Sequence, residues 1–186
     1  MTHTFTGFVL AGGKSRRMGT DKARLDWNGQ PLIDHMVTTV GAVTGMVHVV
    51  GRDPLPDRQP GRGPVEGIAT ALAASTTENN LIVGVDLPRL ETKFLHWLAR
   101  RLIESSNGCV VCVVDERVPL CLGIHRGHGP AIDRYLEDGG RTLRGMLDLI
   151  GYDLVGAQTL HDAGFSDAMF VNINTPGDYQ RSRPRH

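Results

Sequence analysis

The sequence predicts an α/β fold, in which one domain is built on an open, mostly parallel sheet with helices on both faces. Short apolar runs alternate with helix-like stretches along most of the chain, as in parallel strands joined by crossover helices. The run Leu81–Val85 is apolar throughout, as expected of a strand buried on both faces. The 186 residues suffice for one substantial core, and no repeat or long linker divides them. We therefore expect residues 1–186 to form a single domain with a frayed tail at 180–186.

The strands are predicted from short apolar runs that are bounded by turn residues. In chain order they are Phe5–Leu10, Met46–Val50, Leu81–Val85, Gly108–Val114, Val118–Ile124, Leu154–Ala157 and Met169–Ile173. The polar turn Asp115–Arg117 separates the fourth strand from the fifth. The last two strands are short and lie in the less regular part of the chain.

The helices are predicted where apolar residues recur three and four positions apart. In chain order they are Leu32–Val40, Val65–Ala74, Glu91–Ile103, Ala131–Leu136 and Leu143–Leu149. Pro31 precedes the first helix, where proline suits the opening turn. Residues Arg52–Gly63 are rich in Pro, Gly, Asp and Arg, so we expect a loop there.

The overall charge argues against nucleic acid as a partner. The chain has 20 Lys and Arg residues and 20 Asp and Glu residues, so it has no global basic field. No apolar run approaches the roughly 20 residues that cross a bilayer. The first residues, MTHTFTG, lack the basic and then apolar pattern of a secretory signal. We therefore expect neither nucleic acid nor a membrane among the partners.

The three cysteines are expected to be reduced and buried. Cys109 and Cys112 form a C-x-x-C, but they lie in the strand-like run CVVCVV, where residues three apart point to opposite faces. Structural burial is therefore favoured over a metal or redox site. Reduced thiols without a signal sequence predict a cytoplasmic protein.

Residues Leu10–Ala23, LAGGKSRRMGTDKA, carry the strongest functional signal. This run follows the first strand and holds three glycines and four cations. Glycines let backbone N–H groups approach an anion, and Lys and Arg supply the countercharge, so phosphate binding is favoured over a solvated loop. The run is neither a complete G-x-x-x-x-G-K-[ST] motif nor G-x-G-x-x-G. This argues against an ordinary P-loop NTPase or a dinucleotide dehydrogenase.

Asp86 and Asn174 each follow a predicted strand and are candidates for the same edge of the sheet. Asp86 is the last residue of VGVD. Its carboxylate would either hold Mg²⁺ beside bound phosphates or cap the segment that follows. Asn172 and Asn174 would share one face of the last strand, as ligands or as turn-forming residues. Thr175 followed by Pro176 predicts a helix N-cap.

The Leu10–Ala23 run is similar to the signature of nucleotidyltransferases of the molybdenum cofactor guanylyltransferase (MobA-like) type. Their pattern, L-A-G-G-x-S-x-R-M-G-x-D-K, is matched here at each fixed position. Later landmarks agree in order: GPVEGI, VDLP, PLCLGIHR and VNINTPGDY. The resemblance implies a Rossmann-like fold of the nucleotide-diphospho-sugar transferase type. It also implies GMP transfer from GTP to the terminal phosphate of molybdopterin, with Mg²⁺ as cofactor and release of pyrophosphate.

The resemblance also implies a role for each matching residue. Nucleotide contacts fall to Leu10, Ala11, Gly12, Gly13, Lys22, Asp57 and Asp86. Lys22 and Arg17 would act on the phosphates, and Asp86 would hold the metal. Asn172 and Asn174 would lie on the pterin side. Cofactor-biosynthesis proteins and molybdoenzymes are the protein partners implied.

The chain departs from this family pattern at two positions and in the length of one loop. Gly51 stands where some relatives carry an asparagine that contacts the nucleotide, and the stretch between Val50 and Gly63 is short. Glu66 replaces a small residue, and a carboxylate there needs a counter-ion or a position away from the phosphates. The alternatives are CMP transfer to molybdopterin, nucleotide transfer to a sugar phosphate, and a non-catalytic nucleotide-binding module.

Overall fold

The computed structural model describes residues 4–12 and 21–182. The strands are β1 (Phe5–Leu10), β2 (Asp26–Trp27), β3 (Gln30–Pro31), β4 (Met46–Val50), β5 (Asn79–Gly84), β6 (Cys109–Val113), β7 (Cys121–His125) and β8 (Asp153–Gly156). The α-helices are α1 (Leu32–Thr44), α2 (Pro64–Ala74), α3 (Thr92–Glu104), α4 (Gly129–Glu137), α5 (Leu143–Ile150), α6 (Ala157–Asp162) and α7 (Pro176–Ser182). Short 3₁₀ helices are η1 (Lys22–Arg24), η2 (Arg126–His128) and η3 (Asp167–Phe170).

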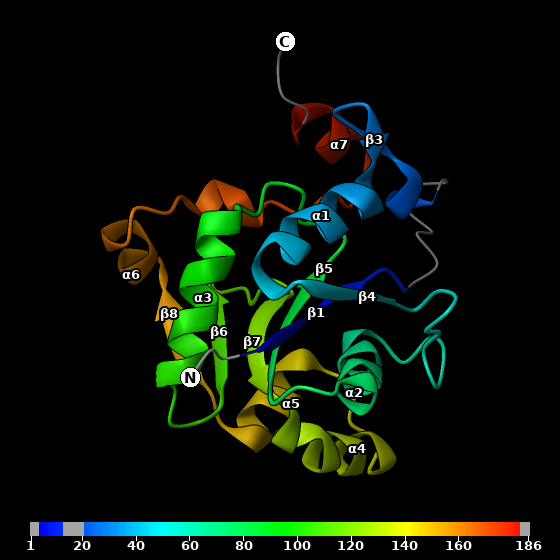
Figure 1. Cartoon of the computed structure of the whole chain (residues 1–186), viewed down its shortest axis with the longest axis vertical. Helices are drawn as coiled ribbons and strands as arrows, with labels where there is room; N and C mark the ends of the chain where they lie inside the picture. Colours follow the sequence, from blue (N-terminus) through cyan, green and yellow to red (C-terminus); the bar gives the residue numbers. More distant parts are fainter. Residues whose placement is uncertain (1–3, 13–20, 183–186) are drawn as a thin grey trace.

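A mixed, mostly parallel sheet forms the centre of the molecule (Figure 1). Its six strands lie in the order β4-β1-β5-β7-β6-β8, and β7 alone runs antiparallel to its neighbours β5 and β6. This confirms the predicted α/β class. The short hairpin β2–β3, which stands apart from this sheet, has no counterpart in the sequence prediction.

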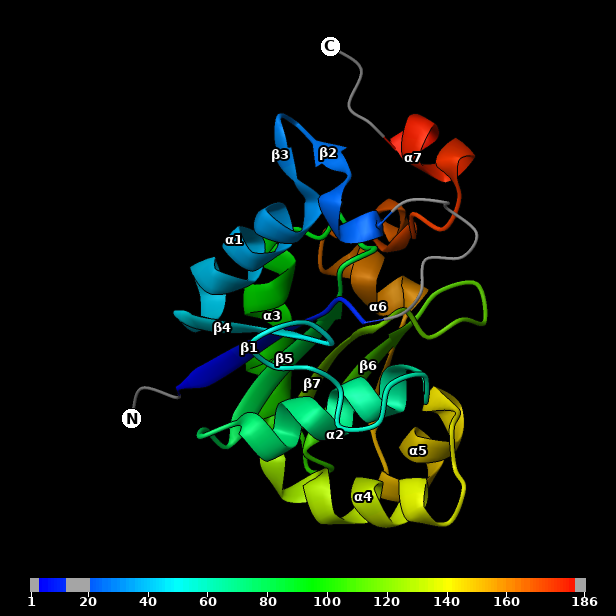
Figure 2. The same ribbon diagram turned by 90° about the vertical axis from the view of Figure 1, so that its right-hand side faces the viewer.

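Helices cover both faces of the sheet, as the sequence predicts (Figure 2). Helices α1 and α3 pack on one face and α2, α4 and α5 on the other, and each face has its own apolar core. Successive side chains of β1 point to opposite faces, so Val9 packs in the core beneath α1 and α3 and Phe8 packs in the core beneath α2, α4 and α5. The sheet is therefore buried on both sides, and ligands can reach it at its edges.

The predicted last strand, Met169–Ile173, is wrong. Residues Asp167–Phe170 form η3, which is capped by Ser166, and the chain then continues without sheet pairing. The apolar run exists because Met169, Phe170 and Ile173 bury their side chains in the core of α1 and α3. Asn172 and Asn174 therefore do not lie on a strand.

The C-terminal segment is helical further than we expected. Helix α7 continues through Ser182, so residues 180–182 of the expected frayed tail are helical. The Arg89 guanidinium donates to the Ser182 carbonyl at 3.0 Å and holds the last turn against the domain. Residues 183–186 lie outside the described part of the chain.

The cysteines behave as predicted. All three thiols are free and buried, and Cys109 and Cys112 lie in the two different cores, on opposite faces of β6. Burial raises the pKa of each of these two thiols to about 12. Among the described residues, no helix has the length and apolar character needed to span a bilayer.

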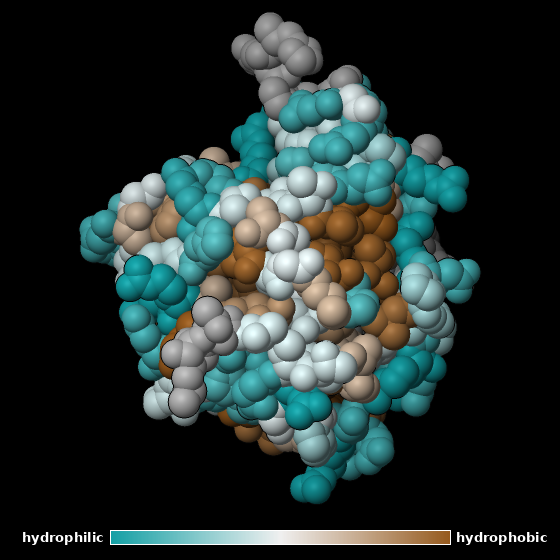
Figure 3. All heavy atoms as spheres, in the orientation of Figure 1, coloured by the Kyte–Doolittle hydropathy of each residue, from teal (hydrophilic) through white to brown (hydrophobic). Residues whose placement is uncertain are grey.

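The outer edge at β4 leaves apolar surface exposed. β4 has a neighbour on one side only, and its residue Met46 is 54% exposed. Figure 3 shows hydrophobic surface gathered between α1 and β4. The partly buried apolar residues of these two elements are Ile33, Val37, Val43, Val47 and Val49.

The close packing of α1 on β1 predicts a stability effect at Gly7. A Cβ at Gly7 would lie 2.4 Å from Val40 Cγ1 and 2.7 Å from Thr44 Oγ1. We expect Gly7→Ala to lower the free energy of unfolding in urea by about 1–3 kcal/mol, because α1 must move away from the sheet. Gly41→Ala is the matched control on α1, since its Cβ would meet only Val47 Cγ2 at 3.4 Å. Alanine there should stabilise the helix by up to about 1 kcal/mol, and equal effects of the two substitutions would contradict this packing.

Candidate functional site

Three parallel strands end in one row, and this row organises the site. Leu10 at the end of β1 pairs with Val50 of β4 and Gly84 of β5. The ladder extends one step further, because Ala11 N donates to Val50 O at 2.9 Å and Val85 N donates to Leu10 O at 3.0 Å. The segments that leave the three strands are therefore neighbours at the carboxyl edge of the sheet, where ligands bind in open α/β folds.

Gly12 and Gly51 meet backbone to backbone at this edge. Gly51 has φ +86°, and a Cβ there would lie 2.4 Å from Gly12 Cα. Gly12 in turn has the Asp57 carboxylate against it, because Asp57 Oδ2 lies 2.7 Å from the place of a Gly12 Cβ. No side chain fits between these two backbones, so this geometry requires glycine at position 51.

The Asp57 carboxylate is partly buried beside this glycine pair. Burial raises its pKa, and the charge of Glu66 raises it further. Asp57 belongs to the Arg52–Gly63 segment, which is a loop as predicted. A carboxylate in this position presents two acceptor oxygens to a ligand that carries N–H groups.

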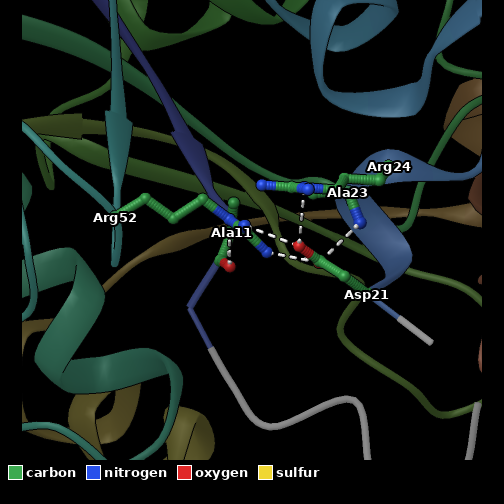
Figure 4. Close-up of polar contacts among 5 residues, drawn as sticks. All are labelled: Ala11, Asp21, Ala23, Arg24 and Arg52. Carbon is green, nitrogen blue, oxygen red and sulfur yellow. Dashed lines mark hydrogen bonds and ion pairs between the residues drawn. The ribbon is translucent and has the colours of Figure 1, made fainter. Parts of the chain in front are cut away.

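Arg52 joins the two ends of the glycine-rich segment (Figure 4). Its Nε donates to the Ala11 carbonyl at 3.2 Å, and its Nη1 and Nη2 donate to the two Asp21 oxygens at 2.8 and 2.5 Å. Asp21 also accepts from Ala23 N at 3.2 Å and thereby caps η1. The hydrogen bond from Arg52 is the main reason that the pKa of Asp21 lies below its usual value. We call these three residues, Ala11, Asp21 and Arg52, the loop clamp.

Sequence reasoning assigned no role to Asp21 or Arg52. A signal was present, because Asp21 is a fixed position of the signature and Arg52 follows a strand end. The pairing joins residues that are 31 positions apart, and only the parallel register brings them together.

Lys22, Asp86, Asn172 and Asn174 meet in one cluster, which we call the junction. Lys22 Nζ donates to Asn174 Oδ1 at 2.7 Å and lies 3.9 Å from Asp86 Oδ2. Asn172 Nδ2 donates to the same Asp86 oxygen at 3.3 Å. Burial raises the pKa of Asp86, whereas the Lys22 charge lowers it. The expected nucleotide-side and pterin-side residues are therefore in direct contact.

Two of the predicted capping positions can be compared with the helix starts. Asp86 does not cap the next helix, because Glu91 is the N-cap of α3. Thr175 is an N-cap as predicted: its Oγ1 accepts from Asp178 N at 3.1 Å, and Asp178 Oδ2 accepts from Thr175 N at 2.8 Å. This reciprocal pair fixes the chain directly after Asn174.

Two cavities open on either side of the junction. The first, of about 320 Å³, brings together most of the expected nucleotide-binding residues, namely Leu10, Ala11, Gly12, Lys22, Asp57 and Asp86. The second, of about 560 Å³, is lined by Asn172 and Asn174 together with Arg117, Asp115, Asp167 and Asp178. Gly13 and Arg17 belong to the expected site but lie outside the described residues.

Asp86 is the carboxylate at the junction that could hold a magnesium ion. Asp86 Oδ1 lies 2.7 Å from the place of a Gly84 Cβ, so glycine at position 84 leaves room for the carboxylate at the cavity wall. Among the described residues, no group of three or more His, Cys, Asp or Glu side chains forms a metal-binding cluster. One carboxylate suffices for Mg²⁺ when phosphate oxygens and water complete the shell.

A glycine-lined cavity with a lysine and a carboxylate at the carboxyl edge of this sheet fits an enzyme of the nucleotidyltransferase class. A family model described as MobA-like NTP transferase domain matches residues 7–151. The chain belongs to this family of MobA-like NTP transferases.

Two of the relatives align over nearly the whole chain. The molybdenum cofactor guanylyltransferase of Xanthomonas euvesicatoria is 33% identical, with 95% of this chain and 93% of the relative covered. The probable molybdenum cofactor guanylyltransferase of Carboxydothermus hydrogenoformans is 30% identical, with 93% and 92% covered.

Solved structures agree on the fold. Molybdopterin-guanine dinucleotide biosynthesis protein A from Archaeoglobus fulgidus superposes with a TM-score of 0.80 at 22% identity, covering 95% of each chain. A 2-C-methyl-D-erythritol 4-phosphate cytidylyltransferase from Thermus thermophilus reaches 0.71 at 15% identity, with 94% of this chain and 95% of that one covered. The fold is thus shared by proteins whose names specify different nucleotides.

The loop clamp predicts a pH-dependent coupling between Arg52 and Asp21. In a double-mutant cycle of Arg52→Ala and Asp21→Ala, urea unfolding at pH 7 should give a coupling energy of about 1–2 kcal/mol. The pKa of Asp21 is lowered from 3.8 in the folded protein, so its contribution is present above 3.8 and is lost as the pH falls through the folded value. A coupling energy near zero at pH 7, or one that rises in acid, would contradict the clamp.

Proposed function

We propose that this protein transfers GMP from GTP to the terminal phosphate of molybdopterin and releases pyrophosphate. The contact between Lys22 and Asn174 carries the proposal, because it joins the cavity expected for the nucleotide to the cavity expected for the pterin. A transfer reaction needs both substrates at one reacting centre. The names of the relatives support guanine and molybdopterin as the substrates.

The first cavity is the proposed nucleotide site. The base would lie at the Gly12–Gly51 contact, where the Asp57 carboxylate accepts hydrogen bonds from guanine N1–H and its 2-amino group. Leu10 and Ala11 would line the base and sugar. The phosphates would then extend toward Lys22, which stands at the opening of η1.

The reacting centre is proposed to lie at the junction. An oxygen of the acceptor phosphate attacks the α-phosphorus of GTP, and the bond from that phosphorus to the β-phosphate oxygen breaks. A phosphate monoester has its second pKa near 6, so the nucleophile is already anionic and needs no strong base. Lys22 would orient the phosphates and offset the negative charge that develops on pyrophosphate. Arg17 is proposed to assist.

Magnesium is the proposed cofactor, and Asp86 is the residue proposed to hold it. When bound, it would supply positive charge beside the phosphates. Asn172 keeps the Asp86 carboxylate oriented through its hydrogen bond at 3.3 Å. Burial of Asp86 disfavours an unpaired negative charge, so a cation there is stabilising.

The second cavity is the proposed acceptor site. Asn172 and Asn174 would present amide donors and acceptors, which suit the polar edges of a pterin. Arg117 lines the same cavity and offers a positive charge for the acceptor phosphate. Proteins of cofactor biosynthesis and molybdoenzymes remain the proposed protein partners, and the buried free thiols are consistent with a cytoplasmic location.

Pyrophosphate release with GTP, molybdopterin and Mg²⁺ tests the proposal. The protein should prefer GTP to CTP, and Lys22→Ala and Asp86→Ala should each lower kcat at least about 100-fold while the fold is kept. Lys93→Ala is the matched control, because Lys93 pairs with Glu91 at the start of α3, away from both cavities. A preference for CTP would favour the cytidylyl alternative. GTP binding without any pyrophosphate release would favour a non-catalytic module.

A further inference from the structure

Glu66 is a buried carboxylate that the proposed reaction does not use. It lies in the first turn of α2 and is 2% exposed. Among the described residues, no donor forms a hydrogen bond with Glu66 Oε1. The nearby cation is Arg58, whose Nε lies 3.5 Å from that oxygen and forms an ion pair with it. A buried carboxylate is costly to keep charged, so this pairing requires an explanation.

Arg58 is attached to the rest of the protein at three points. Its Nη2 donates to Asp133 Oδ1 on α4 at 2.6 Å, and its backbone N donates to Thr70 Oγ1 on α2 at 3.4 Å. Its third partner is Glu66. The side chain of Asp133 is 43% exposed and that of Glu66 only 3%, so water screens the first ion pair far more than the second. Asp133 is thus the closer and directly hydrogen-bonded partner of Arg58, and Glu66 is the partner that is itself buried.

The residue before Arg58 is Asp57, whose carboxylate rests on Gly12. The contacts of Arg58 restrict the backbone directly beside Asp57. The charge of Glu66 also acts on Asp57 through space, because it contributes to the raised pKa of that carboxyl. Arg58, which anchors the Arg52–Gly63 loop, is therefore the direct neighbour of Asp57, the residue proposed to bind the base.

We infer that Glu66 is a positioning residue for base recognition: through Arg58 it holds the Asp57 carboxylate beside Gly12. The inference rests on the proposed function, in which Asp57 accepts from guanine. Two acceptor oxygens match N1–H and the 2-amino group only if the carboxylate keeps its place and angle. A looser carboxylate loses the second hydrogen bond, and hence the preference for guanine over hypoxanthine, which lacks the 2-amino group.

The test compares GTP with ITP as substrates of the full-length protein in the presence of molybdopterin and Mg²⁺. Wild type should prefer GTP in KM, with similar kcat for the two nucleotides. Glu66→Ala should raise KM for GTP about tenfold and leave KM for ITP and both kcat values nearly unchanged, so the preference disappears. Glu66→Gln keeps an oxygen toward Arg58 and should restore part of the preference. Glu104→Gln, which changes an exposed partner of Arg101 on α3, is the matched control and should match wild type.

A second variant keeps the inference testable if Glu66→Ala fails to fold. Arg58→Lys retains the positive charge but lacks the Nε that faces Glu66, and it should lose the same preference for GTP over ITP. Folded Glu66 and Arg58 variants that keep the wild-type preference for GTP over ITP would overturn the inference and leave the proposed function unaffected. Equal losses with GTP and ITP would also overturn it, because they would indicate a purely structural role. A wild-type protein that does not prefer GTP to ITP would overturn both the inference and the proposed role of Asp57.

Discussion

The register of three parallel strands is the constraint on which the site depends. β1, β4 and β5 end in one row at Leu10, Val50 and Gly84, and backbone hydrogen bonds continue for one residue beyond. A shift of β4 by one residue would turn Val50 to the other face and remove Gly51 from its contact with Gly12. The glycine contact, the loop clamp and the junction all lie at this single row, so sheet pairing and site geometry are inseparable.

Each segment beyond the row is then fixed by a contact of its own. The loop clamp ties the residues on either side of segment 13–20 to the segment after β4, and the Thr175–Asp178 cap fixes the chain next to Asn174. The Arg58 ion pairs attach the loop that carries Asp57 to α2 and α4. The residues proposed to act on the substrates are thereby held before substrate binds, which would lower the cost of ordering them during transfer. The sequence analysis required a counter-ion for the Glu66 carboxylate, and the structure provides it in Arg58.

The sequence alone predicted much of the fold and several residues that the structure brings together in the candidate site. Alternating apolar runs identify the strands because burial on both faces demands them, and the carboxyl ends of those strands locate Asp86. The prediction of a strand at Met169–Ile173 was wrong because an apolar run also fits a 3₁₀ helix whose side chains are buried in a core. The pairs Arg52–Asp21 and Arg58–Glu66 were missed because they depend on three-dimensional register and on a loop conformation, which local patterns do not encode.

The proposed reaction places the nucleotide and its acceptor in separate cavities that meet at the junction. A crystal structure of the protein with Mg²⁺ and a non-hydrolysable GTP analogue tests it most directly. We expect the guanine edge against Asp57, the ribose along Ala11 and the α-phosphate beside Lys22 and Asp86. A guanine base in the cavity lined by Asn172 and Arg117, with the first cavity empty, would contradict it.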